Sequence, residues 1–127
     1  MKIKNIKFKA KQLNSGKWFE GDLVRLGNRV CIGGDHIKDG ITDVDPSTVC
    51  MFTGLKDCEG NETWEGDILQ DVDDDDIKYV VIFDVGAFLA RKEGLYTSIP
   101  LHECVGSLGN DVITYAKVVG NKFDKEK

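Results

Sequence analysis

The stretch from residue 45 to residue 69 constrains the fold of this chain more than any other. It begins with a proline turn at Asp45-Pro46, continues with a short apolar run at residues 49–52, and then reaches a turn-forming cluster at residues 57–61. The tight step Trp64-Glu65-Gly66-Asp67-Ile68 follows. Short apolar runs bounded by Gly, Asn, Asp and Pro are typical of strands joined by turns. The stretch therefore predicts a compact β-turn-β unit.

The rest of the chain repeats this pattern of short strands and frequent turns. Apolar and lysine residues alternate over residues 6–11, the period of a strand with one face in a core. We expect one hairpin across Gly27-Asn28 and another across Val85-Gly86. Residues 100–104 begin with proline and predict one helical turn. The predicted fold is all-β: a small, partly open barrel or a pair of packed barrel-like sheets, with one or two short helices.

Length and composition favour one folded domain. A chain of 127 residues with 41% hydrophobic residues can bury a core without disulfides or metals. We expect a single domain over residues 1–127, with an N-terminal β subregion at 1–44, the central stretch and a C-terminal β subregion at 45–123, and a charged tail at 124–127. No apolar run approaches the ~20 residues of a membrane helix, and no signal peptide is evident. A cytoplasmic protein with reduced, mostly buried cysteines is expected.

One short step occurs twice in the chain. Glu20-Gly21-Asp22 recurs as Glu65-Gly66-Asp67, each time with a tryptophan just upstream. The repeat suggests two related β-turn-β entries into one sheet, in which glycine supplies a positive φ and aspartate bonds the amides of its own turn. Each step would also place an aromatic ring beside two carboxylates, a pattern suited to partner binding. Turn formation and packing of the tryptophan are the structural alternative. The candidate partner-binding residues are Trp18, Glu20, Asp22, Trp64, Glu65 and Asp67.

Positive charge is concentrated at the N-terminus. Residues 1–19 contain six lysines and no acid, although the chain has a net charge of −5. Lys7, Lys9 and Lys11 would share one face of the first strand. Lysines commonly protect an exposed edge strand against aggregation, which is the first interpretation. The alternative is contact with nucleic acid, because small β-barrels commonly bind single strands, although the overall acidity of the chain opposes it.

The acidic run at residues 71–76 resembles the start of a calcium-binding loop. The pattern fails where Asp76 stands in place of the required glycine and Ile82 in place of the bidentate glutamate. A solvated hairpin loop is the first interpretation. Weak cation binding and mimicry of DNA against a host enzyme are the alternatives.

Known catalytic and metal-binding patterns find little support. The four cysteines form no C-x-x-C pair, and His102 with Cys104 is the nearest to a nucleophile and base. No sequence feature orients that histidine, and phosphate-binding and dinucleotide-binding glycine motifs are absent from the sequence. We therefore predict a protein that is not an enzyme and that uses no cofactor and no metal.

Several of these segments together resemble the YopX family, small proteins that are common in bacteriophages and prophages. The family pattern is matched by Asp45-Pro46, Phe52-Thr53-Gly54-Leu55-Lys56-Asp57, Gly60 and Trp64-Glu65-Gly66-Asp67-Ile68. Lys7-Phe8-Lys9-Ala10 is similar to the opening segment of the family, with Lys9 in place of arginine, and residues 117–123 are similar to its closing strand. The resemblance implies the family's fold but no biochemical role.

The resemblance, together with the missing catalytic set, favours a phage or prophage accessory protein that binds another protein of phage or host origin. A homo-oligomer whose basic first strand meets an acidic surface is one form of this hypothesis. The alternatives are a small β-barrel that binds nucleic acid and an acidic DNA mimic that inhibits a host enzyme. No membrane partner is expected.

Overall fold

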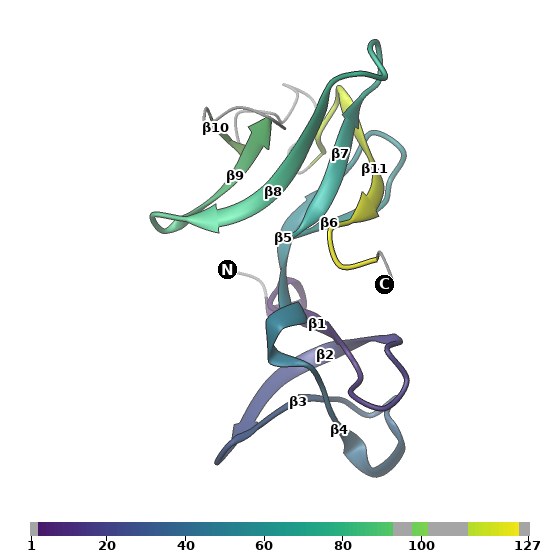
Figure 1. The fold of residues 1–127 in the computed structure, drawn as a ribbon, viewed down its shortest axis with the longest axis vertical. Coiled ribbons are helices and arrows are strands. Elements are labelled where there is room, and N and C mark those ends of the chain that lie inside the picture. Colours follow the sequence, from purple (N-terminus) through teal and green to yellow (C-terminus); the bar gives the residue numbers. More distant parts are fainter. Residues whose placement is uncertain (1–2, 93–97, 102–111, 125–127) are drawn as a thin grey trace. The chain divides into compact units, whose positions relative to one another are not determined.

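The computed structural model describes residues 3–92, 98–101 and 112–124 (Figure 1). The regular elements of these residues are β-strands and short 3-10 turns, which confirms the all-β prediction. The strands form antiparallel sheets, and neither sheet closes into a barrel within the described residues. Of the predicted helical turn, Pro100 ends a strand and Leu101 is in 3-10 conformation, whereas residues 102–104 lie outside the described residues.

The chain forms two compact units, Met1–Phe52 and Thr53–Lys127. The division falls inside one strand, β5 (Cys50–Lys56), and therefore inside the central stretch rather than before it. The first residues of β5 pair within the first unit, and its later residues belong to the second unit with β6 (Glu62–Trp64). The single-domain assignment remains a prediction.

The first unit is an antiparallel sheet in the order β4-β3-β2-β1-β5. Its other strands are β1 (Phe8–Lys11), β2 (Trp18–Leu26), β3 (Arg29–Gly33) and β4 (Ile41–Asp43). Three 3-10 turns accompany them, η1 (Ile3–Asn5), η2 (Lys38–Gly40) and η3 (Pro46–Thr48). The turn Gly27-Asn28 joins β2 to β3, as the sequence predicts.

The core of the first unit consists of Ala10, Ile32, Ile37 and Val44, with partly buried apolar neighbours around them. Phe8 and Ala10 of β1 face this core, so Lys7, Lys9 and Lys11 share the other face, in agreement with the alternation in the sequence.

Strand β1 is not an edge strand, and that interpretation of its lysines is wrong. Residues 8–11 pair with β2 on one side, and Phe8 and Lys9 pair with Met51 and Cys50 of β5 on the other. The partner from β5 lies about 40 positions later in the chain, too far for local sequence patterns to reveal it.

The second unit contains a sheet in the order β10-β9-β8-β7-β11 (Figure 1). Its strands are β7 (Asp67–Asp71), β8 (Lys78–Asp84), β9 (Ala87–Lys92), β10 (Ser98–Pro100) and β11 (Ala116–Asn121). The hairpin β8–β9 has the predicted two-residue turn Val85-Gly86. One face of this sheet packs in the core of the unit, which consists of Leu69, Val81, Ala90, Leu101, Ile113 and Ala116.

The repeated Glu-Gly-Asp step does not produce a repeated structure, so the prediction of two related turn entries is wrong. Glu65 and Gly66 form the tight connection from β6 to β7, and Gly66 has φ +88°. The earlier step instead lies inside the continuous strand β2, where Asp22 pairs with Gly33 of β3. Gly21 is needed there because a Cβ would collide with the carbonyl oxygen of Gly33.

Candidate functional site

The three candidate lysines of β1 contact aromatic rings in the first unit. Lys7 Nζ lies 4.8 Å from the centroid of the Phe52 ring and 3.8 Å from a carboxylate oxygen of Glu20. Lys9 and Lys11 place their Nζ atoms 4.7 and 5.5 Å from the centroid of the Trp18 ring. Cation–π contacts of this kind stabilise by about 0.5–1 kcal/mol at exposed positions. We call the three lysines, Trp18 and Phe52 the basic aromatic cluster.

Trp18 and Glu20 occupy alternating positions of β2, opposite Lys11 and Lys9, so both side chains share the sheet face that carries the lysines. Trp18 is half-buried and pairs with Lys11, while Glu20 and Asp22 are both exposed on β2. The backbone carbonyl of Glu20 is 2.6 Å from Nε2 of His36, so a ring nitrogen of this histidine is already occupied. A role of Trp18, Glu20 and Asp22 in partner binding stays a prediction.

The second candidate set is largely buried in a polar network. Trp64 is 4% exposed and Asp67 is 2% exposed. Oδ2 of Asp67 accepts a hydrogen bond from the backbone N–H of Trp64 at 2.7 Å, and its Oδ1 accepts one from Asn121 Nδ2 at 3.0 Å. The backbone carbonyl of Glu65 accepts a longer hydrogen bond, 3.4 Å, from the same Asn121 Nδ2. These contacts close the β6–β7 turn, and a partner-binding role of Trp64, Glu65 and Asp67 stays a prediction.

A second buried carboxylate bonds to β11 at another position. Asp57 has no exposed surface. Its Oδ1 accepts hydrogen bonds from the backbone N–H groups of Glu59 and Asn61 at 2.9 and 2.8 Å. Its Oδ2 accepts one from the N–H of Val118 in β11 at 2.8 Å, and one from the Asn61 side chain at 3.3 Å. The loop after β5 is thereby fastened to β11.

The residues of the central stretch and of the closing strand thus meet in space. Asn121 follows Gly120 in β11, and its side chain also accepts a hydrogen bond from the N–H of Phe123 at 2.9 Å. The Nδ2 of Asn121 would lie 3.1 Å from a Cβ placed at Gly66, which is closer than ordinary contact. Glycine at position 66 therefore serves both the positive φ of the turn and the approach of Asn121. The contacts of Asn121 thus join β11 to the β6–β7 turn.

Thr63 in β6 carries a buried hydroxyl with no hydrogen-bond partner among the described residues. A buried hydroxyl without a partner costs about 1–3 kcal/mol in proteins. We therefore expect Thr63→Val to raise the free energy of unfolding by about 1 kcal/mol, measured by urea denaturation.

The control for this prediction is Thr48→Val. The Thr48 hydroxyl accepts from the N–H of Lys11 at 2.9 Å and donates to the carbonyl of Asp45 at 2.8 Å, so its loss should destabilise by about 1–2 kcal/mol. Equal destabilisation by both variants would contradict the assignment of Thr63 as unsatisfied.

Two of the described cysteines, Cys31 and Cys58, are poor nucleophiles. Cys31 and Cys50 are buried free thiols, as predicted, whereas Cys58 is exposed. Burial, followed by the hydrogen bond from its Sγ to Asp43 Oδ1 at 3.1 Å, raises the pKa of Cys31. Desolvation, followed by neighbouring carboxylates, raises the pKa of Cys58. Both thiols therefore stay protonated at neutral pH and have little nucleophilic character. The pair His102 and Cys104 lies outside the described residues.

Asp43 accepts hydrogen bonds from both Cys31 and Arg29. Its Oδ1 also accepts from Arg29 Nε at 3.0 Å. The hydrogen bond from Cys31, followed by that from Arg29, lowers the pKa of Asp43. Among the described residues, no group of three or more His, Cys, Asp and Glu side chains is arranged to hold a metal ion.

The acidic run forms the loop between β7 and β8, where the sequence predicted a hairpin loop. Asp71 and Asp74 accept hydrogen bonds from the N–H groups of Asp73 and Asp76 at 2.8 and 2.9 Å. Residues 73–76 are all exposed. Two of the carboxylates therefore stabilise the turns of their own loop.

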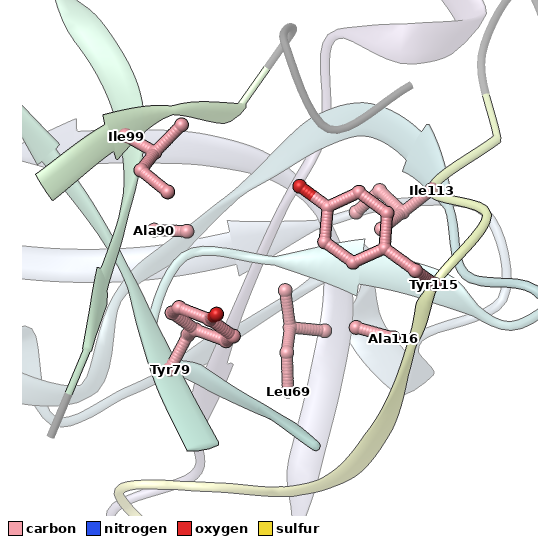
Figure 2. Close-up of a pocket in the computed structure, with 7 residues that line it drawn as sticks. All are labelled: Leu69, Tyr79, Ala90, Ile99, Ile113, Tyr115 and Ala116. Carbon is pink, nitrogen blue, oxygen red and sulfur yellow. The ribbon is translucent and has the colours of Figure 1, made fainter. Parts of the chain in front are cut away.

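One enclosed cavity is an apolar gap in the core of the second unit. Figure 2 shows Tyr79, Ala90 and Ile99 along one side and Ile113, Tyr115 and Ala116 along the other, with Leu69 between them. Its volume is about 10 Å³, roughly the space for one water molecule. A more open depression of about 210 Å³ is lined by Thr53, Leu55, Ala87, Phe88 and Leu101.

The β8–β9 hairpin carries a feature that the sequence analysis missed. Val85 at its tip is 93% exposed and has φ +53°. Next to it, Phe83 is 49% exposed and lies edge-to-face on Phe88, with ring centroids 5.0 Å apart. The available signal was the dipeptide Val85-Gly86, because two-residue hairpin turns favour Asn-Gly or Asp-Gly. The tip of this hairpin is therefore apolar and exposed, and it contains a valine in a conformation that valine rarely adopts.

The 3-10 turns, which are the only helical elements of the described residues, lack the length and hydropathy needed to cross a bilayer. Curated proteins yield no match to the chain. The family model described as YopX protein matches residues 5–126, nearly the whole sequence. The segments that match the family pattern include Asp57, Gly66, Asp67 and Asn121, the residues that join the β5–β6 loop and the β6–β7 turn to β11. This chain therefore belongs to the YopX family.

Proposed function

We propose that this protein is a non-enzymatic accessory protein of a phage or prophage that acts in the cytoplasm by binding another protein. The contact is made by the tip of the β8–β9 hairpin, through Phe83 and Val85. The observation that carries the proposal is the exposed Val85 in a left-handed backbone conformation.

A left-handed valine is unfavourable. The conformation costs an L-residue about 1–2 kcal/mol, and branching at Cβ makes it rarer still. In the folded chain Val85 is almost fully exposed, so burial in the core does not offset this cost. Strained residues persist mainly at functional positions. Contact with a partner would bury the side chain and explain its presence.

The neighbouring rings enlarge the apolar tip. Phe83 and Phe88 face each other across the hairpin, with an angle of 64° between ring planes. Aromatic residues are enriched among the positions that contribute most to protein interfaces. A rigid hairpin also presents them with little loss of conformational entropy on binding.

The basic aromatic cluster supports the nucleic-acid alternative less well. Lys9 and Lys11 lie over Trp18, and Lys7 lies over Phe52 and beside Glu20. Binding of single strands relies on free ring faces for stacking with bases. Here the lysines already cover these rings, so base stacking would have to displace them.

The test is an affinity pull-down of tagged protein from bacterial lysate, with and without nuclease. Val85→Asn should remove the captured protein. Because asparagine tolerates the left-handed region, the same variant should raise the free energy of unfolding by about 1 kcal/mol. Loss of binding with a gain in stability would exclude unfolding as the cause.

The matched control is Leu26→Asn, which removes an exposed apolar residue beside the β2–β3 turn. It should leave the captured protein unchanged. Capture that survives Val85→Asn but is lost when residues 73–76 are neutralised would instead support the DNA-mimic alternative. Recovery of nuclease-sensitive material alone, lost on Lys7→Glu, Lys9→Glu and Lys11→Glu together, would support nucleic-acid binding.

A further inference from the structure

Strand β8 is apolar on both faces. Tyr79, Val81 and Phe83 point to the face that carries the core of the second unit. Val80 and Ile82 therefore point to the opposite face. A strand with one solvated face normally alternates apolar and polar residues, whereas near-continuous apolar runs are typical of strands covered on both sides. The sequence of β8 thus indicates that its second face is also covered.

The register of the sheet defines this second face. Ile68 of β7 lies opposite Val80, and Leu89 of β9 lies opposite Ile82. We call Ile68, Val80, Ile82 and Leu89 the apolar face. All four are half-buried, and none belongs to the core cluster of either unit.

Charges at the two ends of β8 frame the apolar face with opposite signs. Lys78 lies on this face at one end of the strand, and Asp84 lies on it at the other. Arg91 is opposite Val80, and Lys117 lies across Gln70 from Lys78, so the Lys78 end is basic.

Strand β8 is self-complementary about Val81 on this face. Lys78 and Asp84 are equally far from it along the strand, and so are Val80 and Ile82. A two-fold axis that lies between two such sheets, parallel to them and perpendicular to β8 at the level of Val81, would place Lys78 of one copy against Asp84 of the other and Val80 against Ile82. Contacts of this isologous kind bury the same patch on both copies.

We propose that a second copy of this chain covers the apolar face, forming a two-fold dimer by packing sheet on sheet across β8. Five strands at about 4.8 Å spacing and about six residues of 3.4 Å give a face on the order of 500 Å². This area is smaller than the ~800 Å² per partner of a standard interface, which corresponds to a weak dimer. The inference does not depend on the hairpin-tip contact, because Phe83 and Val85 are not part of the apolar face.

Sedimentation velocity of the full chain at about 1–100 μM tests the dimer. The wild type should reach twice the 14.1 kDa mass of one chain. Lys78→Glu and Asp84→Lys should each weaken association by about tenfold, since each sets like charges against each other across the axis. The double variant Lys78→Glu/Asp84→Lys should restore association to within about threefold of wild type, because both pairs are reversed together.

Two further variants separate docking from folding. Ile82→Thr keeps a β-branched residue and should abolish the dimer while leaving the urea midpoint of the monomer within error. Lys92→Glu makes the same charge change opposite Tyr79, on the core face, and should leave association unchanged. A monomeric wild type, or a double variant as weak as either single variant, would overturn the proposal. A monomer that captures a different protein through Ile82 would overturn it in favour of a foreign partner.

Discussion

Replacing Asp57 by alanine is expected to lower the free energy of unfolding by about 3 kcal/mol, a large part of the stability of a domain this size. The carboxylate accepts from three backbone N–H groups, those of Glu59, Asn61 and Val118. Once the side chain is removed, water can bond to the N–H groups of Glu59 and Asn61, and these new bonds offset part of the lost stability. The Val118 amide is only partly exposed and joins two distant segments, so its loss carries much of the cost.

Urea denaturation at neutral pH measures this loss, and hydrogen exchange at Val118 should locate it in β11. Asp57→Asn keeps one accepting oxygen but turns an amide N–H₂ toward donors, so it should lose roughly half as much. Asp76→Ala removes the same charge from the exposed β7–β8 loop and should stay within about 0.5 kcal/mol of wild type. A loss below about 1 kcal/mol for Asp57→Ala would show that this carboxylate does not anchor β11.

The local parts of the fold could be predicted from the sequence. Gly27-Asn28 and Val85-Gly86 are short turns between apolar runs, and both hairpins form there. The alternation of β1 also predicted correctly which side chains face the core. These features depend on neighbours within a few residues, which a linear pattern records well.

Contacts between distant segments could not be predicted in the same way. The pairing of β1 with β5 made an apparent edge strand internal. The repeated Glu-Gly-Asp step became a strand interior in one place and a turn in the other, because Gly33 approaches Gly21 whereas Asn121 approaches Gly66. Identical tripeptides thus acquired different conformations from the residues packed against them.

The candidate site shows a related limit. Trp64 and Asp67 suggested a binding patch by residue type, yet Asp67 accepts hydrogen bonds inside the scaffold and both residues are buried. The segments that identify the family therefore contain the residues that hydrogen-bond to β11, and they do not indicate a binding site. By contrast, Val85 and the second apolar side of β8 were visible in the sequence as departures from turn chemistry and from alternation. Such departures point to surfaces more directly than matches to a pattern do.

Gly21→Ala is expected to destabilise the first unit by about 2–4 kcal/mol. A Cβ at this position would meet the carbonyl oxygen of Gly33 and approach the Ile32 side chain at 3.2 Å. The backbone carbonyl belongs to β3 and cannot rotate away as a side chain can. To make room, β2 and β3 would have to separate, which weakens their ladder and the packing of Ile32 in the core.

Gly27→Ala is the matched control, because it lies in the same hairpin. Gly27 has φ +60°, but no atom lies within 4 Å of the position that an alanine methyl group would occupy, so alanine there carries only the backbone cost of about 1 kcal/mol. Urea denaturation of the two variants therefore separates collision from conformational strain. If Gly21→Ala lowers the free energy of unfolding no more than Gly27→Ala does, then β2 and β3 tolerate a side chain where Gly21 approaches Gly33. A larger loss, with slowed exchange retained at Val118 in β11, would show that the close approach of Gly21 to Gly33 stabilises the first unit in particular.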